Sequence, residues 1–90
     1  MGKIVMNDYI YGVCEAESYK DTWSWKLRNI KHLKTFDSYE EAYDFYRMIV
    51  KNLYLSQCEN WWLVWINPKD NTIIQWDGLQ RVVHSGIVKM

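Results

Sequence analysis

The stretch FDSYEEAYDFYRMIVKNLYL, residues 36–55, decides the fold, because its apolar side chains repeat with a helical period. With successive residues about 100° apart, an apolar stripe forms opposite a polar arc. Ser38 is followed three residues later by Glu41, the spacing of a capping box, in which the serine oxygen accepts the backbone N–H of Glu41 while the glutamate reaches back. The pattern predicts one long helix over residues 36–55. Its predicted apolar stripe is Tyr39, Ala42, Tyr43, Tyr46, Ile49, Val50, Leu53 and Tyr54.

Two strands are predicted before this helix. Residues 3–14 carry apolar side chains on both sides of a period-two alternation, which is typical of a strand buried on both faces. Residues 22–30 alternate strictly between apolar and polar side chains, which is typical of a half-buried strand. The polar residues 15–21 between them are expected to form a loop.

Two further strands are predicted after the helix. WWLVWI, residues 61–66, and TIIQWD, residues 72–77, flank Pro68, Lys69, Asp70 and Asn71, a set of residues that favours a hairpin turn. A short fifth strand is expected near residues 81–84, and residues 86–90 are expected to fray.

The order strand, strand, helix, strand, strand predicts an α+β two-layer sandwich. We expect an antiparallel sheet of four to five strands, in the order ββαββ, with one long helix packed on one face. Ninety residues without a linker or an internal repeat indicate a single domain, residues 1–90.

One helix covers only one face of a sheet, and residues 61–66 are apolar on both sides. The sequence therefore predicts an exposed aromatic face, and exposed patches of this kind usually mark interaction sites. Two alternatives remain open: the aromatic side chains fill a small core, or the C-terminal segment covers the far face. The predicted binding residues are Trp62, Trp65, Trp76 and Tyr11, with Lys26 and Arg28 at the border.

Charge and composition exclude several classes of protein. Eleven basic and eleven acidic residues balance, and 49% of the chain is apolar, which excludes a disordered chain. The one basic run is residues 26–34, KLRNIKHLK, so a nucleic-acid or nucleotide site using Lys26, Arg28, Lys31 and Lys34 is the alternative function. We expect a cytoplasmic protein with no membrane partner, because no leader pattern or long apolar run is seen.

Chemistry-bearing motifs are scarce. The chain has two cysteines and two histidines with no metal-ligand spacing and no Gly-rich phosphate loop, so no metal, no cofactor and no enzymatic activity are expected. An enzyme using Cys58 or Asp8 is the least favoured hypothesis. Cys58 is expected in an accessible loop, whereas Cys14 is expected to be a buried, inert thiol.

The function expected from these features is that of a small, non-enzymatic protein-binding module. With eight Lys, three Arg and no catalytic motif, the chain is similar in character to short one-domain proteins of bacteriophages and mobile elements. That resemblance implies an inhibitor that binds a host or defence protein. Self-association as a homodimer is the other expected form of protein binding.

Overall fold

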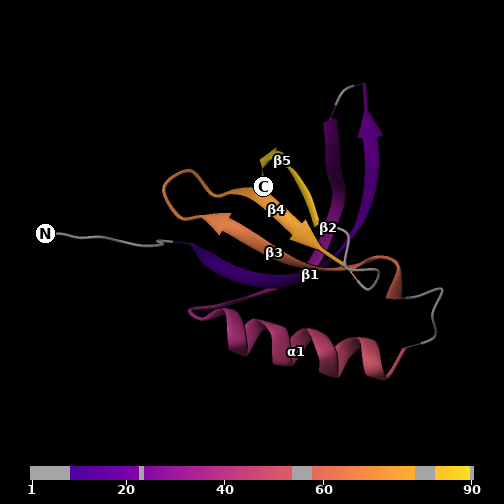
Figure 1. Cartoon of the computed structure of the whole chain (residues 1–90), viewed down its shortest axis with the longest axis vertical. Helices are drawn as coiled ribbons and strands as arrows, with labels where there is room; N and C mark the ends of the chain where they lie inside the picture. Colours follow the sequence, from indigo (N-terminus) through magenta and orange to yellow (C-terminus); the bar gives the residue numbers. More distant parts are fainter. Residues whose placement is uncertain (1–8, 23, 54–57, 79–82, 90) are drawn as a thin grey trace, which may run out of the picture.

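The computed structural model describes residues 9–22, 24–53, 58–78 and 83–89 (Figure 1). One helix and five strands make up the described chain. In chain order they are β1 (Ile10–Asp21), β2 (Ser24–Phe36), α1 (Tyr39–Lys51), β3 (Trp61–Asn67), β4 (Thr72–Asp77) and β5 (Val83–Lys89).

The strands form one antiparallel sheet with the spatial order β2-β1-β3-β4-β5. Helix α1 lies along one face of this sheet (Figure 1). The predicted α+β architecture, an antiparallel sheet with one long helix on one face, is therefore confirmed. No described helix is both long enough and apolar enough to cross a membrane.

Helix α1 begins at Tyr39 and ends at Lys51, within the predicted range 36–55. Ser38 is the N-cap, and its hydroxyl oxygen accepts the backbone N–H of Glu41 at 3.2 Å, as the capping box predicts. The Ser38 hydroxyl also donates to the Glu41 carboxylate at 3.1 Å. Of the predicted stripe, Ala42 and Tyr46 are buried.

The expected loop at residues 15–21 is wrong, because these residues continue β1 and pair with β2 from Ser24 to Lys31. Polar side chains fit a strand here, since from Glu17 onward β1 pairs with β2 and with no other described strand. The two strands form an arm that rises from the sheet (Figure 1). The predicted first strand, residues 3–14, lies partly outside the described residues, and β1 begins at Ile10.

Two β-bulges bend β2. The pairs across the two strands are Val13 with Lys34, Glu15 with Lys31 and Glu17 with Arg28. Each step of two residues along β1 therefore matches a step of three residues along β2. The extra residues coincide with positive φ at Asn29 (56°) and His32 (55°). Asparagine and histidine adopt this left-handed conformation more readily than most residues. Such bulges increase strand bending and twist, which curls the end of the sheet.

The curl brings the outermost strands together. A Cβ atom on Gly86 of β5 would lie 2.6 Å from the backbone oxygen of Trp25 in β2, so only glycine fits this approach. Leu27 of β2 and Val88 of β5 belong to the same buried cluster. The sheet thus covers much of its own far face, and the remaining core residues of that cluster are Cys14, Ala16, Trp62, Val64, Ile66, Ile73 and Trp76.

A second core lies between the sheet and α1. Val13 and Leu63 from the sheet pack there against Ala42 and Tyr46 from the helix. Side chains along β3 therefore alternate between the two cores. The helix side has Trp61, Leu63 and Trp65. The first cluster, which we call the sheet-only core because its buried residues all come from strands, has Trp62, Val64 and Ile66.

The C-terminal half contains the predicted hairpin. The backbone N–H of Asn71 donates a hydrogen bond to the backbone oxygen of Asn67 at 2.8 Å and closes the turn. The Thr72 hydroxyl donates to the Asp70 carboxylate at 2.7 Å. The expectation that residues 86–90 fray is wrong for the described part, since Val88 and Lys89 pair with Ile73 and Thr72. The expected strand at 81–84 lies partly outside the described residues, and β5 starts at Val83.

Candidate functional site

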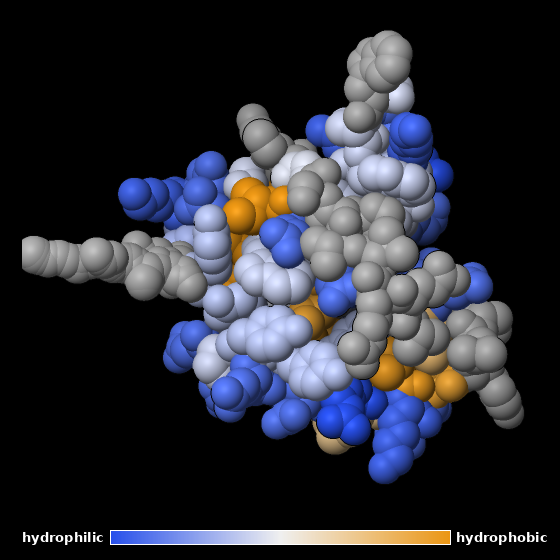
Figure 2. Space-filling model, viewed as in Figure 1, coloured by the Kyte–Doolittle hydropathy of each residue, from blue (hydrophilic) through white to orange (hydrophobic). Residues whose placement is uncertain are grey.

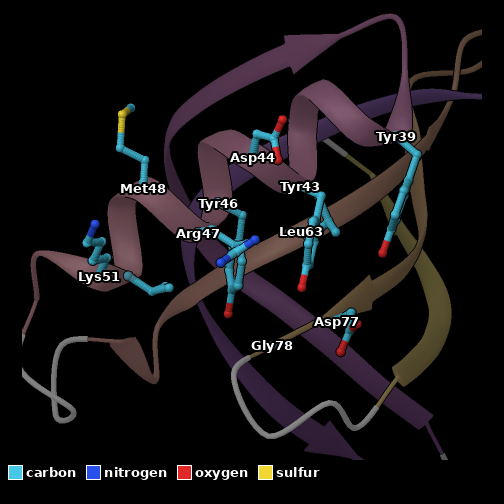
Figure 3. A pocket seen from close by; sticks show the side chains of 11 residues that line it. Tyr39, Tyr43, Asp44, Tyr46, Arg47, Met48, Lys51, Leu63, Asp77 and Gly78 are labelled. Atoms are coloured by element: carbon cyan, nitrogen blue, oxygen red, sulfur yellow. The ribbon is translucent and has the colours of Figure 1, made fainter.

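A groove with a volume of about 700 Å³ lies between α1 and the ends of β3 and β4. Side chains of the helix line one side, and Leu63, Asp77 and Gly78 line the other. In Figure 3, Tyr39, Tyr43, Tyr46 and Arg47 extend from the helix toward Asp77, while Met48 points to the opposite side. We call this site the tyrosine groove and define it by Tyr39, Tyr43, Tyr46, Arg47, Leu63 and Asp77.

The three tyrosines share a helix face because they are spaced four and three residues apart. Tyr39 is 39% exposed, Tyr43 is half-buried and Tyr46 is only 7% exposed, so the row descends from the surface into the core. The Tyr39 and Tyr43 rings stack with centroids 5.9 Å apart. The groove therefore offers the rings of Tyr39 and Tyr43, whereas the Tyr46 hydroxyl is enclosed.

Two sheet residues extend the aromatic surface. The Tyr39 ring lies 5.8 Å from the Tyr11 ring and 5.8 Å from the Trp65 ring, and Tyr11 meets Trp65 edge-on at 6.2 Å. We call Tyr11, Trp65, Tyr39 and Tyr43 the aromatic cluster. All four are half-buried or exposed. The space-filling view shows pale side chains of intermediate hydropathy across the middle of the molecule, between blue margins (Figure 2).

Two polar atoms of residues that line the groove are enclosed by the fold. The hydroxyl oxygen of Tyr46 and Oδ1 of Asp77 are both enclosed, and neither has a hydrogen-bond partner among the described residues. Burial, followed by the electrostatic effects of Asp77 and Cys58, raises the pKa of Tyr46 to about 12. An unpaired buried polar group costs about 1–3 kcal/mol, so these two atoms call for an explanation.

Trp62 and Trp76 do not contribute to an exposed face, and that part of the predicted surface is wrong. Trp62 is 9% exposed and Trp76 is fully buried, because the curled sheet encloses them. Each indole N–H has an internal acceptor: Trp62 donates to the Ala16 carbonyl at 3.0 Å, and Trp76 donates to the Ser18 hydroxyl at 3.3 Å. Both are structural residues of the sheet-only core.

The structure brings together Tyr11 and Trp65 of the predicted site, but it places Lys26 and Arg28 elsewhere. Arg28 pairs in register with Glu17, six residues along β1 from Tyr11, which is about 20 Å of strand. Lys26 pairs with Tyr19, still farther along the arm. The two cations therefore do not border the aromatic cluster.

The basic run of β2 is interleaved with acids of β1. The Arg28 guanidinium lies 3.2 Å from the Glu17 carboxylate and 4.7 Å from the Tyr19 ring centroid. Asn29 donates to Glu17, and this bond, followed by the Arg28 contact, lowers the pKa of Glu17. The Nε2 atom of His32 lies 3.8 Å from the Oε1 atom of Glu15. These acids reduce the positive potential that a phosphate backbone would need.

The two cysteines are both free and buried. Burial raises the pKa of Cys14 to about 12, as expected for an inert thiol. The expected accessibility of Cys58 is wrong, since it is 2% exposed and donates to the Val50 carbonyl at 3.3 Å. Asp8 lies outside the described residues. Within the described ranges, no group of three His, Cys, Asp or Glu side chains is placed to hold a metal ion.

The residues that sequence reasoning missed are Tyr46 and Asp77. The helical period assigned Tyr46 to the core, which is correct, but the period does not show whether its hydroxyl has a partner. The available signal was a hydroxyl group on four stripe positions, Tyr39, Tyr43, Tyr46 and Tyr54, where a purely structural stripe would be aliphatic. No family model, curated protein or solved structure matches the chain.

Proposed function

We propose that the protein is a non-enzymatic module that binds a different protein, and that the aromatic cluster and the tyrosine groove form its docking surface. One observation carries the proposal: a set of contacting aromatic rings from the helix and the sheet, half-buried or exposed, borders a groove that Tyr39 and Tyr43 also line. Tyrosine and tryptophan are enriched among residues that dominate binding energy, because their rigid rings bury a large area at small entropic cost.

The surface also has the composition of an interface. It combines aromatic faces with hydroxyl groups, and Arg47 lies at its edge with its guanidinium 5.8 Å from the Tyr43 ring centroid. Aromatic residues and arginine are enriched at interface cores, whereas lysine and glutamate are depleted. The interleaved charges of the β1–β2 arm make nucleic acid the less favoured ligand.

The test compares two tyrosine variants of the tagged protein. Tyr39→Ser removes the ring at the junction of groove and cluster, and Tyr19→Ser removes a ring on the β1–β2 arm, about 26 Å of strand from Tyr11. We expect one protein from the source cell to be retained by the wild type and by Tyr19→Ser, and lost by Tyr39→Ser. With that protein purified, calorimetry should show at least about a tenfold weaker affinity for Tyr39→Ser.

Three results would overturn the proposal. The first is equal affinity of Tyr39→Ser and the wild type for the captured protein. The second is a homodimer in light scattering that dissociates on Tyr39→Ser, since a second copy is then the occupant. The third is salt-sensitive binding of single-stranded DNA or RNA that Lys26→Ala with Arg28→Ala abolishes, which supports the basic arm instead.

A further inference from the structure

The aromatic cluster carries hydrogen-bond donors that the fold leaves open. The hydroxyl groups of Tyr11 and Tyr43 and the indole N–H of Trp65 bond to no other described residue, and none of these atoms is enclosed as the Tyr46 hydroxyl is. Resting on the proposed function above, we propose that the partner protein presents a proline-rich segment, in the polyproline II conformation, to the aromatic cluster.

The rings of the cluster form a continuous apolar surface from the sheet to the groove. Tyr39 stands at its centre, with its ring centroid 5.8 Å from those of Tyr11 and Trp65 and 5.9 Å from that of Tyr43. The Tyr39 ring meets Tyr11 at 82° and Trp65 at 34°, so the surface is ridged rather than flat. Proline-rich segments dock on aromatic-lined surfaces of this kind, because their rigid pyrrolidine rings pack between the aromatic side chains.

The hydrogen-bonding groups of such a segment complement those of the cluster. A polyproline II helix has no internal hydrogen bonds, so its carbonyl oxygens accept from a binding partner, and proline has no N–H that needs an acceptor. The Trp65 indole is a donor only, and the hydroxyls of Tyr11 and Tyr43 donate as well. A segment rich in N–H groups would instead bring donors to a surface where only phenol oxygens accept.

Strand addition does not fit this surface. The strands that carry Tyr11 and Trp65 are β1 and β3, and both lie inside the sheet with a paired strand on either side. Their backbone groups serve the sheet, so a partner segment meets side chains alone. A polyproline II segment suits this mode because it is preformed and loses little conformational entropy on binding.

The charges at the surface favour an uncharged segment. The aromatic cluster contains no charged side chain. Among the described residues that line the adjoining groove, the acidic Asp44 and Asp77 balance the basic Arg47 and Lys51. A nucleic acid would need an excess of cations for its phosphates, whereas a run of prolines carries no charge to compensate.

The test uses octaproline with blocked ends and its all-D enantiomer, which has the same composition and the opposite hand. Each peptide is titrated into the wild-type protein, and the indole N–H and tyrosine ring signals are followed by NMR. We expect saturable shifts at Trp65, Tyr11 and Tyr43 with the L peptide, and at least about fivefold weaker binding of the D peptide. Trp65→Phe keeps an aromatic ring and removes the donor, so it should weaken the L peptide by about fivefold or more. Trp61→Phe changes another half-buried indole of β3, outside the cluster, and should bind as the wild type does.

Equal affinity for the two enantiomers, no saturable binding of the L peptide, or undiminished binding to Trp65→Phe overturns the proposal. The comparison of enantiomers in the wild type needs no variant, and Tyr43→Phe is the second variant if Trp65→Phe does not fold. If octaproline does not bind but capture of the partner still depends on Tyr39, this inference is wrong and the proposed function stands. If octaproline binds the cluster and capture is unaffected by Tyr39→Ser, the proposed function is wrong and the site remains.

Discussion

The indole nitrogen of Trp62 donates to the backbone oxygen of Ala16 at 3.0 Å, which ties β3 to β1 inside the sheet-only core. This bond explains why a large side chain with a polar atom is stable in that core. Trp62→Phe removes the donor and leaves the Ala16 oxygen without it, so the free energy of unfolding should fall by about 1–3 kcal/mol. Urea denaturation measures the loss. Trp61→Phe, which changes a half-buried indole, should cost less, and an equal cost for both variants would contradict the role of this bond.

The close approach of Gly86 to β2 predicts a second loss of stability. A methyl group at position 86 would lie 2.6 Å from the Trp25 backbone oxygen and 3.2 Å from the Trp76 ring, so Gly86→Ala must push the two strands apart. We expect a loss of about 1–3 kcal/mol in the free energy of unfolding. At Gly12 the nearest atoms are farther away: the end of the Leu33 side chain at 3.1 Å, and the Lys34 backbone oxygen and the Val64 side chain at 3.2 Å. Thermal unfolding should therefore show a smaller loss for Gly12→Ala, and the reverse order would refute this packing.

The N-cap of α1 is open to a direct test. Ser38→Ala removes the acceptor for the Glu41 N–H and should lower the free energy of unfolding by about 0.5–2 kcal/mol. Ser38→Thr keeps the hydroxyl and should stay close to the wild type. Because α1 presents the tyrosine row, we also expect broader Tyr39 ring signals in the alanine variant. An unchanged melting temperature in Ser38→Ala would show that the cap contributes nothing.

The unpaired hydroxyl of Tyr46 predicts a gain in stability when it is removed. Tyr46→Phe keeps the ring and deletes an enclosed polar atom that has no partner among the described residues. The free energy of unfolding should rise by about 1 kcal/mol. Tyr43→Phe, at a half-buried ring, should change it by less than about half of that. A drop in stability for Tyr46→Phe would mean that the hydroxyl has a partner in solution.

Stability should fall at alkaline pH. The pKa of Cys14 is raised from 9.0 to about 12, and that of Tyr46 from 10.0 to about 12. Below pH 9 both groups are protonated in the folded and unfolded chains, so they add no pH dependence. Above these ordinary values the unfolded chain releases protons that the folded chain keeps, and each group lowers the free energy of unfolding by roughly 1 kcal/mol per pH unit.

Urea denaturation across pH 8 to 11 separates the two groups. The wild type should lose stability from about pH 9, whereas Cys14→Ala should stay level until about pH 10, where Tyr46 begins to act. Curves of the same shape for both proteins would assign the alkaline loss to other residues.

The sequence predicted those parts of the fold that depend on local periodicity. The cap at Ser38, the helical stripe and the hairpin around Pro68 each follow from residues close together in the chain. The strand over residues 15–21 was missed because its pairing comes from β2, and within these residues only Ala16 is buried, so the sequence shows no apolar alternation. The curl of the sheet was missed because it depends on left-handed Asn29 and His32, which a polar run does not distinguish from ordinary strand residues.

The same curl of the sheet explains why two predicted binding residues, Trp62 and Trp76, are buried. Trp62 of β3 and Trp76 of β4 were expected at the surface because a strand pattern shows apolar side chains but not what covers them. The cover comes from β2 and β5, which are distant in sequence and meet at Trp25 and Gly86. Of the predicted binding residues, Tyr11 and Trp65 lie in contact in the aromatic cluster, and their neighbour Tyr39 was assigned only to the helix stripe.

The contact between β2 and β5 also bears on resistance to aggregation. The outermost strands of an open sheet display rows of unpaired backbone groups that can template another chain into a fibril. Near Trp25 and Gly86 these two strands lie against each other, so neither accepts an added strand there. Recognition by strand addition is blocked along this stretch. Among the described tryptophans, the strands that meet there also help to enclose Trp62 and Trp76.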